Sequence, residues 1–185
     1  MQASDPQRLA SQVEGRGLPP VEQWNPSFSG DMDLLITRRG TWVHEGAAIE
    51  RESLVRLFST ILRCDEDGAY YLVTPVEKWR IQVEDSPFLG VLLAVSGQRE
   101  TQDLRFITNV GDEVTAGADH PIRVDYATRD AEPVPRLHVR ARLWALISRS
   151  IFLELAELGE ERIIDGERHH GVWSQGQFFS LGRLD

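Results

Sequence analysis

The chain contains one short pattern twice, far apart in the sequence. Gly40-Thr41-Trp42-Val43-His44-Glu45-Gly46 is echoed by Gly171-Val172-Trp173-Ser174-Gln175-Gly176. Each copy places a Trp two residues after a Gly and ends on another Gly, four residues after Trp42 but three after Trp173. An amphipathic helix is expected after the first copy and before the second. The echo favours two small related modules with a cleft between them, although two unrelated hairpins would give the same pattern.

Charge and composition exclude several classes of protein. The net charge of −9 is spread evenly, because residues 1–86 hold 14 acidic and nine basic side chains and residues 87–185 hold 15 and 11. This diffuse negative field repels nucleic-acid phosphates, so we expect no DNA or RNA surface. No apolar run approaches the ~18 residues of a membrane span, and the first residues lack a signal-peptide pattern. With a single cysteine, Cys64, the sequence predicts a protein of a reducing cytoplasm.

Apolar spacing and turn residues predict the elements of the first half. A short peripheral helix is expected to start at Asp5-Pro6 and to run to about Val13. An amphipathic helix is predicted over 51–62, since its apolar residues share one stripe at helical spacing. Strands are predicted over 32–37, 41–44, 70–73 and 78–83, with turns at 38–40 and 65–68.

In the second half strands dominate. They are predicted over 88–95, 104–108 and 121–126, followed by a helical region from about Leu137 to Leu158 whose break near Ser150 is left open. A hairpin turn at Asp165-Gly166 precedes strands near 168–173 and 177–181. Because helices and strands are grouped, we expect an α+β fold of two related modules, each a mainly antiparallel sheet packed with a helix. The predicted domains are an N-terminal extension (1–17), an α+β domain (18–85) and a β-rich α+β domain (86–182).

The segment Thr74-Pro75-Val76-Glu77-Lys78-Trp79 is a candidate binding element. It follows an apolar strand, and Pro75 restricts the backbone, so Thr74, Glu77 and Lys78 would be held in place. A lysine ammonium beside an aromatic face can hold a phosphate or a base ring. A Glu–Lys surface pair is an equally good interpretation of the same residues.

Two loop-rich segments in the second half supply further candidates. Thr108 and Asn109 would offer hydrogen bonds, His120 a proton-transfer group and Arg123 an anion clamp, although both segments are also plausible turns. Arg140 belongs to an arginine-rich stretch with Arg136, Arg142 and Arg149, placed at the start of the predicted helical region. That stretch would attract a phosphate or pair with the chain's own acids.

No catalytic or metal-binding motif is recognised. Phosphate-binding glycine loops, nucleophile elbows and zinc-protease signatures are missing from the sequence. Asp31 and Asp33 lie on one side of an extended segment and would bind a cation or split acid and base roles, but solvated turn acids explain them better. His169 and His170 would point to opposite faces of a strand, so we predict no metal site there. We assign no catalytic residue, and the cofactor is left unknown.

Several longer motifs resemble a known family. Trp24-Asn25-Pro26, the segments 30–33, 57–62, 72–78 and 108–123, and Trp173-Ser174-Gln175-Gly176-Gln177-Phe178-Phe179 are similar to the bacterial domain-of-unknown-function family numbered 1285. The resemblance runs from about Leu18 to Gly182. It implies a duplicated two-domain core and a C-terminal domain superficially like a pleckstrin-homology fold. It also implies a binding site for a nucleotide-based ligand at the domain interface, and a role in signal transduction linked to oxidative stress. One departure is Ser150, where relatives are expected to have proline.

Three hypotheses of function follow. The first is a non-enzymatic binding module that holds a small anionic, nucleotide-like ligand between its domains. In it Lys78, Arg123 and Arg140 meet charge, Thr74, Thr108 and Asn109 donate hydrogen bonds, and a Trp stacks on a base. The second is a metal-dependent hydrolase or transferase that uses Asp31, Asp33, Glu77 and His120. The third is a protein–protein adaptor without a small ligand, whose protein partner is unknown. We favour the first, because no acid, base or nucleophile set is locally organised.

Overall fold

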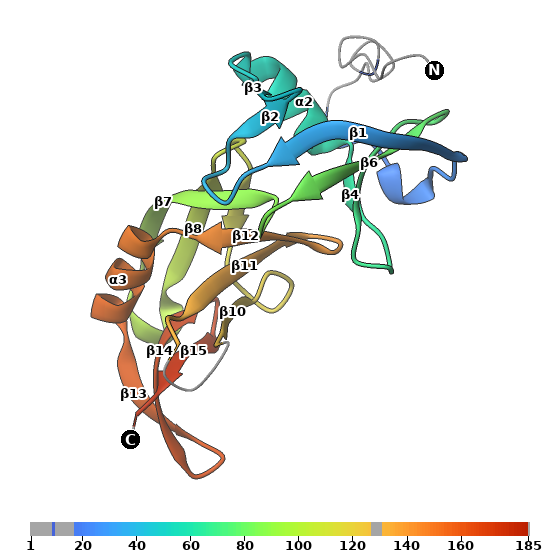
Figure 1. Ribbon diagram of the computed structural model, residues 1–185. Helices are drawn as coiled ribbons and strands as arrows, with labels where there is room; N and C mark the ends of the chain where they lie inside the picture. Colours follow the sequence, from blue (N-terminus) through green and yellow to red (C-terminus); the bar gives the residue numbers. More distant parts are fainter. Residues whose placement is uncertain (1–8, 10–16, 127–130, 185) are drawn as a thin grey trace. The chain divides into compact units, whose positions relative to one another are not determined.

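The computed structural model describes Leu9, residues 17–126 and residues 131–184 of the chain. The chain divides into two compact units, Met1–Ser86 and Pro87–Asp185 (Figure 1). The N-terminal helix predicted over 5–13 lies outside the described residues, apart from Leu9, which is buried. Over the described ranges, no helix has the length and apolar character needed to cross a membrane.

The N-terminal unit is a six-stranded sheet in the order β3-β2-β1-β6-β5-β4. Its central strands β1 and β6 are parallel, and all other neighbours are antiparallel. Helix α2 is amphipathic, as its spacing predicts, and its Phe58 packs on Trp42 of β2 with ring centroids 6.3 Å apart. The elements are η1 (Val21–Gln23), β1 (Phe28–Ile36), β2 (Trp42–His44), β3 (Ala47–Ala48), α2 (Glu52–Thr60), β4 (Leu62–Cys64), β5 (Tyr70–Val73) and β6 (Lys78–Val83).

The C-terminal unit has a second six-stranded sheet and a separate three-stranded sheet. The six strands follow the order β10-β11-β12-β7-β8-β9, and the three strands follow β13-β14-β15. The elements are β7 (Phe88–Ser96), η2 (Arg99–Thr101), β8 (Asp103–Thr108), β9 (Glu113–Thr115), β10 (Ile122–Asp125), β11 (Val134–Arg140), β12 (Leu143–Ile147), α3 (Arg149–Leu158), β13 (Glu160–Ile164), β14 (Glu167–Ser174) and β15 (Gln177–Arg183).

The two six-stranded sheets repeat one topology. Taken from the opposite edge, the second order is β9-β8-β7-β12-β11-β10, which matches β3-β2-β1-β6-β5-β4 strand for strand. In each sheet the strands that come first and last in the sequence lie side by side at the centre and run parallel. They are β1 with β6 and β7 with β12. Each sheet is therefore two three-stranded meanders joined along a parallel pair. The predicted α+β fold of two related, mainly antiparallel modules is confirmed.

The sequence echo does not mark corresponding places in this repeat. Its first copy includes β2 of the six-stranded sheet, whereas its second lies on β14 of the three-stranded sheet. What the copies share is a two-residue hairpin turn with positive φ at both positions, Glu45-Gly46 and Gln175-Gly176. A positive φ at both turn residues suits a type I′ turn, which matches the right-handed twist of the strands that it joins. The echo therefore reflects one turn chemistry used twice, and the duplication resides in the sheets.

The helix predicted from Leu137 is wrong over its first eleven residues. Residues 137–147 form most of β11, a turn and β12, and only Arg149–Leu158 is helical. Burial alternates along β11, with Leu137 and Val139 inside, and the same alternation continues along β12. A period of two is the signature of a strand. Ser148 is the N-cap of α3, since its hydroxyl accepts a hydrogen bond from the N–H of Ile151, so the predicted break is where the helix begins.

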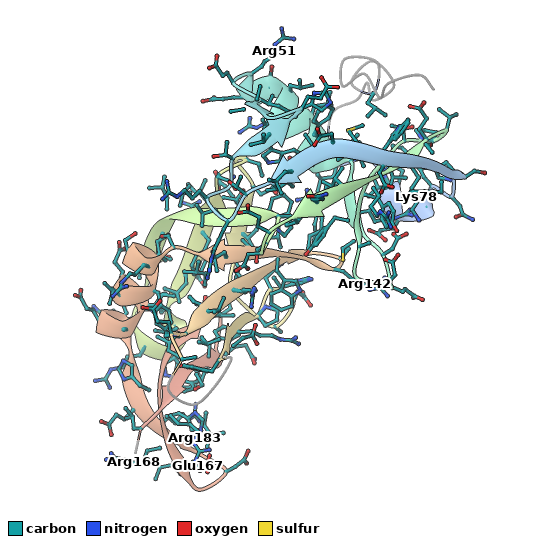
Figure 2. All side chains as sticks on the ribbon, in the orientation of Figure 1. Arg51, Lys78, Arg142, Glu167, Arg168 and Arg183 are labelled. Atoms are coloured by element: carbon teal, nitrogen blue, oxygen red, sulfur yellow. The ribbon has the colours of Figure 1, made fainter. Side chains whose placement is uncertain are left out.

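The arginine-rich stretch lies on the β11–β12 hairpin and at the start of α3, not along one helix. Arg136 and Arg140 lie on β11, and Arg149 begins α3. Arg142 follows Ala141 in the β11–β12 turn, where Ala141 adopts a φ of +45° (Figure 2). Four arginines that would line one helical region are thus distributed over a strand, a turn and a helix start.

The three-stranded sheet is attached to the six-stranded sheet of the same unit by polar contacts. The side-chain amide of Gln102 donates to the carbonyl of Trp173 at 2.9 Å. The hydroxyl of Tyr126 donates to the carbonyl of Leu181 at 2.7 Å. Figure 1 shows β13 and β14 continuing past α3, and Ile163 near their turn is 71% exposed. The three-stranded sheet is therefore hydrogen-bonded to the rest of its unit at Trp173 and Leu181, while the turn between β13 and β14 extends into solvent.

Candidate functional site

Thr74 and Glu77 close the turn between β5 and β6. The N–H of Thr74 donates to the carbonyl of Glu77 at 2.9 Å. In return the Thr74 hydroxyl oxygen accepts the N–H of Glu77 at 3.0 Å. Thr74 is fully buried, so its side chain shapes the turn and presents little to a ligand. The side chain of Glu77, the residue before β6, is half-buried.

Lys78 is engaged by its own unit. Its Nζ lies 2.5 Å from an Oδ2 of Asp65 and 4.1 Å from the centre of the Tyr71 ring (Figure 2). The aromatic ring beside Lys78 is therefore that of Tyr71 on β5, which lies outside the predicted segment that ends at Trp79. Trp79, its neighbour in sequence, packs beside Gly30. The Lys78 charge is matched by Asp65, which makes it a weaker candidate for an incoming anion.

Asp65 binds a second cation, the buried Arg63. Arg63 Nε donates to Asp65 Oδ1 at 2.6 Å, while its Nη1 donates to the carbonyls of Val21 and Trp24 at 3.0 and 2.7 Å. Burial alone would raise the pKa of the Asp65 carboxyl, but hydrogen bonds from Arg63 and Lys78 outweigh it and lower that pKa below its ordinary value of 3.8. The network ties the η1 segment to β4 and has no acid held neutral for catalysis.

Tyr71 donates a hydrogen bond to Asp67 next to this network. The N–H of Ala69 donates to Asp67 and lowers the pKa of its carboxyl, and the Tyr71 hydroxyl adds to this at 2.8 Å. The same hydrogen bond to Asp67 raises the pKa of Tyr71. Both groups therefore keep their ordinary charge states near neutral pH. The polar cluster on β4, β5 and β6 is a set of matched charges.

Thr108, Asn109 and Arg140 meet around the turn between β8 and β9. The Thr108 hydroxyl accepts the N–H of Asp112 at 3.0 Å, and Arg140 Nη1 lies 2.7 Å from Asp112 Oδ2. Asn109 Oδ1 accepts the N–H of Leu89 at 2.9 Å, so it fastens the turn to β7. The structure thus brings three predicted residues together. Their side chains hold this corner of the sheet, and the charge of Arg140 is matched by Asp112.

His120 and Arg123 lie beside two residues that were not predicted, His138 on β11 and Trp144 on β12. The rings of His120 and His138 stack with centroids 5.8 Å apart, and His138 contacts Trp144 edge to face at 5.0 Å. The Arg123 guanidinium lies 4.9 Å from the Trp144 ring centre. These four residues define what we call the β10–β12 face, a partly exposed surface of one sheet.

Hydrogen bonds hold the imidazoles of the β10–β12 face. Nδ1 and Nε2 of His138 face the carbonyl oxygens of Asp119 and Ala141, at 2.9 and 2.7 Å. Nδ1 of His120 faces the carbonyl of His138 at 3.2 Å. The rings are therefore held in place by contacts within the protein itself.

The charge of the β10–β12 face is positive within an acidic chain. Arg123 sits directly opposite Arg136 in the β10–β11 register. Arg136 is matched by Asp125 at 2.5 Å, whereas Arg123, among the described residues, has no carboxylate partner. Directly opposed like charges destabilise a sheet unless something compensates them. An anion bound at Arg123 would provide that compensation.

Sequence reasoning missed His138 and Trp144 because both were assigned to a helix. They face one another across the β11–β12 hairpin, as a directly opposed pair. The turn residues Ala141-Arg142 give no glycine or asparagine signal. The alternation of apolar and polar residues before this turn is the sequence signal that predicts a strand and would have found His138.

The remaining candidates are separated in the structure. Asp31 is exposed and pairs with Arg80 at 2.5 Å. His169 and His170 have different partners, the Ser180 hydroxyl at 2.7 Å and the Ala156 carbonyl at 2.7 Å. This agrees with the expectation that neighbouring strand residues point to opposite faces. Within the described ranges, no group of three or more metal-ligating side chains is close enough to hold an ion.

Family models match both units. One, described as "Domain of unknown function (DUF1285), N-terminal domain", matches residues 19–86, and another, described as "Protein of unknown function (DUF1285), C-terminal domain", matches residues 87–181. The chain belongs to the DUF1285 family. The resemblance stated from the sequence motifs is thereby confirmed.

Two solved DUF1285 structures are similar to this chain. A DUF1285 family protein from Silicibacter pomeroyi DSS-3 is 46% identical, with a TM-score of 0.89 over 99% of this chain and 97% of that one. A DUF1285 family protein from Shewanella baltica OS155 is 28% identical, with a TM-score of 0.53 over 68% of this chain and 91% of that one. No curated protein matches the chain. The two-unit architecture is therefore that of the family.

Proposed function

We propose that this DUF1285 protein is a binding module for a small anionic ligand with a planar ring, such as a nucleotide. The observation that carries the proposal is Arg123, whose guanidinium lies on the Trp144 ring at 4.9 Å without a carboxylate partner among the described residues. An arginine in this position offers two N–H donors to a phosphate. Trp144 beside it offers a face on which a base can stack.

The neighbouring residues suit such a ligand. His120 and His138 stack next to Trp144 and add flat rings to the same face. Arg136 lies directly opposite Arg123, and its own charge is paired with Asp125, which leaves Arg123 to meet the anion. The net charge of −9 makes this local positive surface the more specific, because anions are repelled elsewhere. A nucleotide would place its phosphate at Arg123 and its base near Trp144.

Two more specific parts of the function expected from the sequence remain predictions. One is that the ligand lies between the two domains, with Lys78, Thr74 and Glu77 taking part. The other is that binding signals to a protein partner. The internal contacts of Lys78 with Asp65 support a first test on the C-terminal unit, since the residue's charge is already matched.

Titration calorimetry of the full chain with AMP, ATP and inorganic phosphate tests the proposal. We expect nucleotide binding that Arg123→Ala weakens by about 10- to 100-fold, the cost of one charged hydrogen-bonding group. Trp144→Ala should weaken the binding of nucleotides more than the binding of inorganic phosphate, because the Trp144 ring stacks on the base. Arg162→Ala is the matched control, since Arg162 lies 4.6 Å from the Trp173 ring on another sheet. Equal losses from Arg123→Ala and Arg162→Ala, or no nucleotide binding, would reject the site.

A further inference from the structure

Strand β7 is apolar along nearly its whole length, yet its second half is exposed. A continuous apolar run such as Phe88-Leu89-Gly90-Val91-Leu92-Leu93-Ala94-Val95 is typical of a strand buried on both faces. Val91, Leu92 and Val95 are nevertheless 40%, 59% and 43% exposed. Several exposed apolar side chains so close together mark an interaction site.

The exposure has a cause in the sheet. β12 pairs with β7 only over Phe88–Gly90, whereas β8 pairs with it as far as Ser96. Beyond Gly90, β7 therefore has a strand partner on one side, within the described residues. Helix α3 follows β12 and lies against β7, and its Leu153 is 55% exposed. Leu92 and Val95 are three residues apart in a regularly paired stretch, so they point to opposite faces of the sheet, and what the exposed residues share is the unpaired edge of β7. We call this edge, with Val91, Leu92, Val95 and the nearby Leu153, the β7–α3 surface.

We infer that the β7–α3 surface pairs with the same surface of a second copy of this chain. Residues 91–96 carry no charged side chain, so two antiparallel copies of this segment meet without opposed like charges. Elsewhere two copies repel each other, because each has a net charge of −9. A two-fold axis lets one surface serve both partners and closes the assembly at a dimer.

The charges at the two ends of the surface complement each other. Glu100, in η2, follows the C-terminal end of β7, while Arg149 begins α3 next to Ser148, whose N–H points to the Gly90 carbonyl at 3.4 Å. Antiparallel copies bring Glu100 of each copy toward Arg149 of the other. Among the described residues, the ion pair given for Arg149 is a loose one with Glu132, 3.8 Å apart and highly exposed on both sides.

Sedimentation velocity of the full chain over a wide concentration range tests the inference. We expect a monomer–dimer equilibrium in which Leu92→Asp raises the dissociation constant at least tenfold. Ile163→Asp, at an apolar position on β13 that is 71% exposed against 59% for Leu92, should leave it unchanged. Arg149→Glu and Glu100→Arg should each weaken the dimer, and the double variant should recover it. Circular dichroism confirms that each variant is folded.

Two results would overturn the inference. A wild-type chain that stays monomeric at every concentration shows that the surface does not pair with itself. That is also the result expected if it receives a different protein or a lipid surface. A dimer that Leu92→Asp and both charge variants leave intact is held together elsewhere.

Discussion

Ser174 donates its hydroxyl hydrogen to the backbone carbonyl of Ala116 at 2.7 Å, and the same hydroxyl accepts the N–H of Leu104 at 2.9 Å. Ser174 ends β14, and its two partners belong to β8 and to the residue after β9. It is fully buried. One small side chain therefore satisfies two backbone groups of the large sheet from the end of the small one. This explains why the three-stranded sheet is part of the C-terminal unit.

Ser174→Ala should destabilise the C-terminal unit by about 1–3 kcal/mol, since it leaves a buried N–H and a buried carbonyl without their partner. Urea denaturation of the full chain, followed by tryptophan fluorescence, gives the free energy of unfolding. Ser96→Ala, at an exposed serine of the same unit, is the control and should change it by less than about 0.5 kcal/mol. Similar effects from both variants would show that Ser174 does not join the sheets.

Gly171→Ala should destabilise the same unit through a steric clash. A Cβ at this position would lie 2.3 Å from the Phe179 carbonyl oxygen and 2.6 Å from the Phe178 ring. Relief requires movement of backbone, so we expect a loss of about 1–3 kcal/mol or more. Gly90→Ala is the matched control, because its Cβ would find its nearest neighbour at an ordinary 3.7 Å. If thermal unfolding places both variants at the same midpoint, the packing of Phe178 over Gly171 is wrong.

Asp65 should make the stability of the N-terminal unit depend on acid pH. Its folded-state pKa is lowered from 3.8 because hydrogen bonds from Arg63 and Lys78 outweigh the effect of burial. The contribution of the carboxylate is thus present above the unfolded-state pKa and is lost as pH falls through the folded-state pKa. We expect the melting temperature to fall between about pH 5 and about pH 3.

Asp65→Asn should lower the melting temperature at neutral pH and flatten this acid dependence. Asp33→Asn, at an exposed acid of β1, should leave the dependence as it is in the wild type. Parallel pH profiles for the wild type and Asp65→Asn would mean that Arg63 and Lys78 do not stabilise the Asp65 carboxylate.

Lys78→Ala should affect stability more than ligand binding. Its ammonium is paired with Asp65 and packed on Tyr71, so its loss removes a partly exposed ion pair worth about 0.5–1 kcal/mol. Calorimetry should show the nucleotide affinity of the wild type in this variant. A tenfold loss of affinity with unchanged unfolding would instead return Lys78 to the binding site predicted from the sequence.

Elements with a strong local signal were predicted well. β6 spans Lys78–Val83 as predicted, and α2 falls within the predicted 51–62. The turns at Arg38-Arg39-Gly40 and Asp165-Gly166 are where their residues place them. In these segments apolar spacing, turn chemistry and tertiary structure all favour one conformation.

The error at residues 137–147 has a physical reason. Val139, Leu143 and Ile147 are each four residues apart, which satisfies both a helical and a strand spacing, so the pattern alone does not separate the two. Pairing with β10 and β7, which are distant in sequence, makes the strand the stable choice. The same pairing brings His138 and Trp144 to Arg123.

The sequence by itself determined the family, the α+β class and the local elements, because these depend on motifs, composition and contacts between near neighbours. It also identified Arg123 and His120 as chemically suitable groups. Only the tertiary structure decided that Lys78 and Arg140 have their charges matched by Asp65 and Asp112 and that Arg123 stacks on Trp144. The physical reason is that strand register fixes which distant side chains are neighbours, and the sequence does not carry register locally.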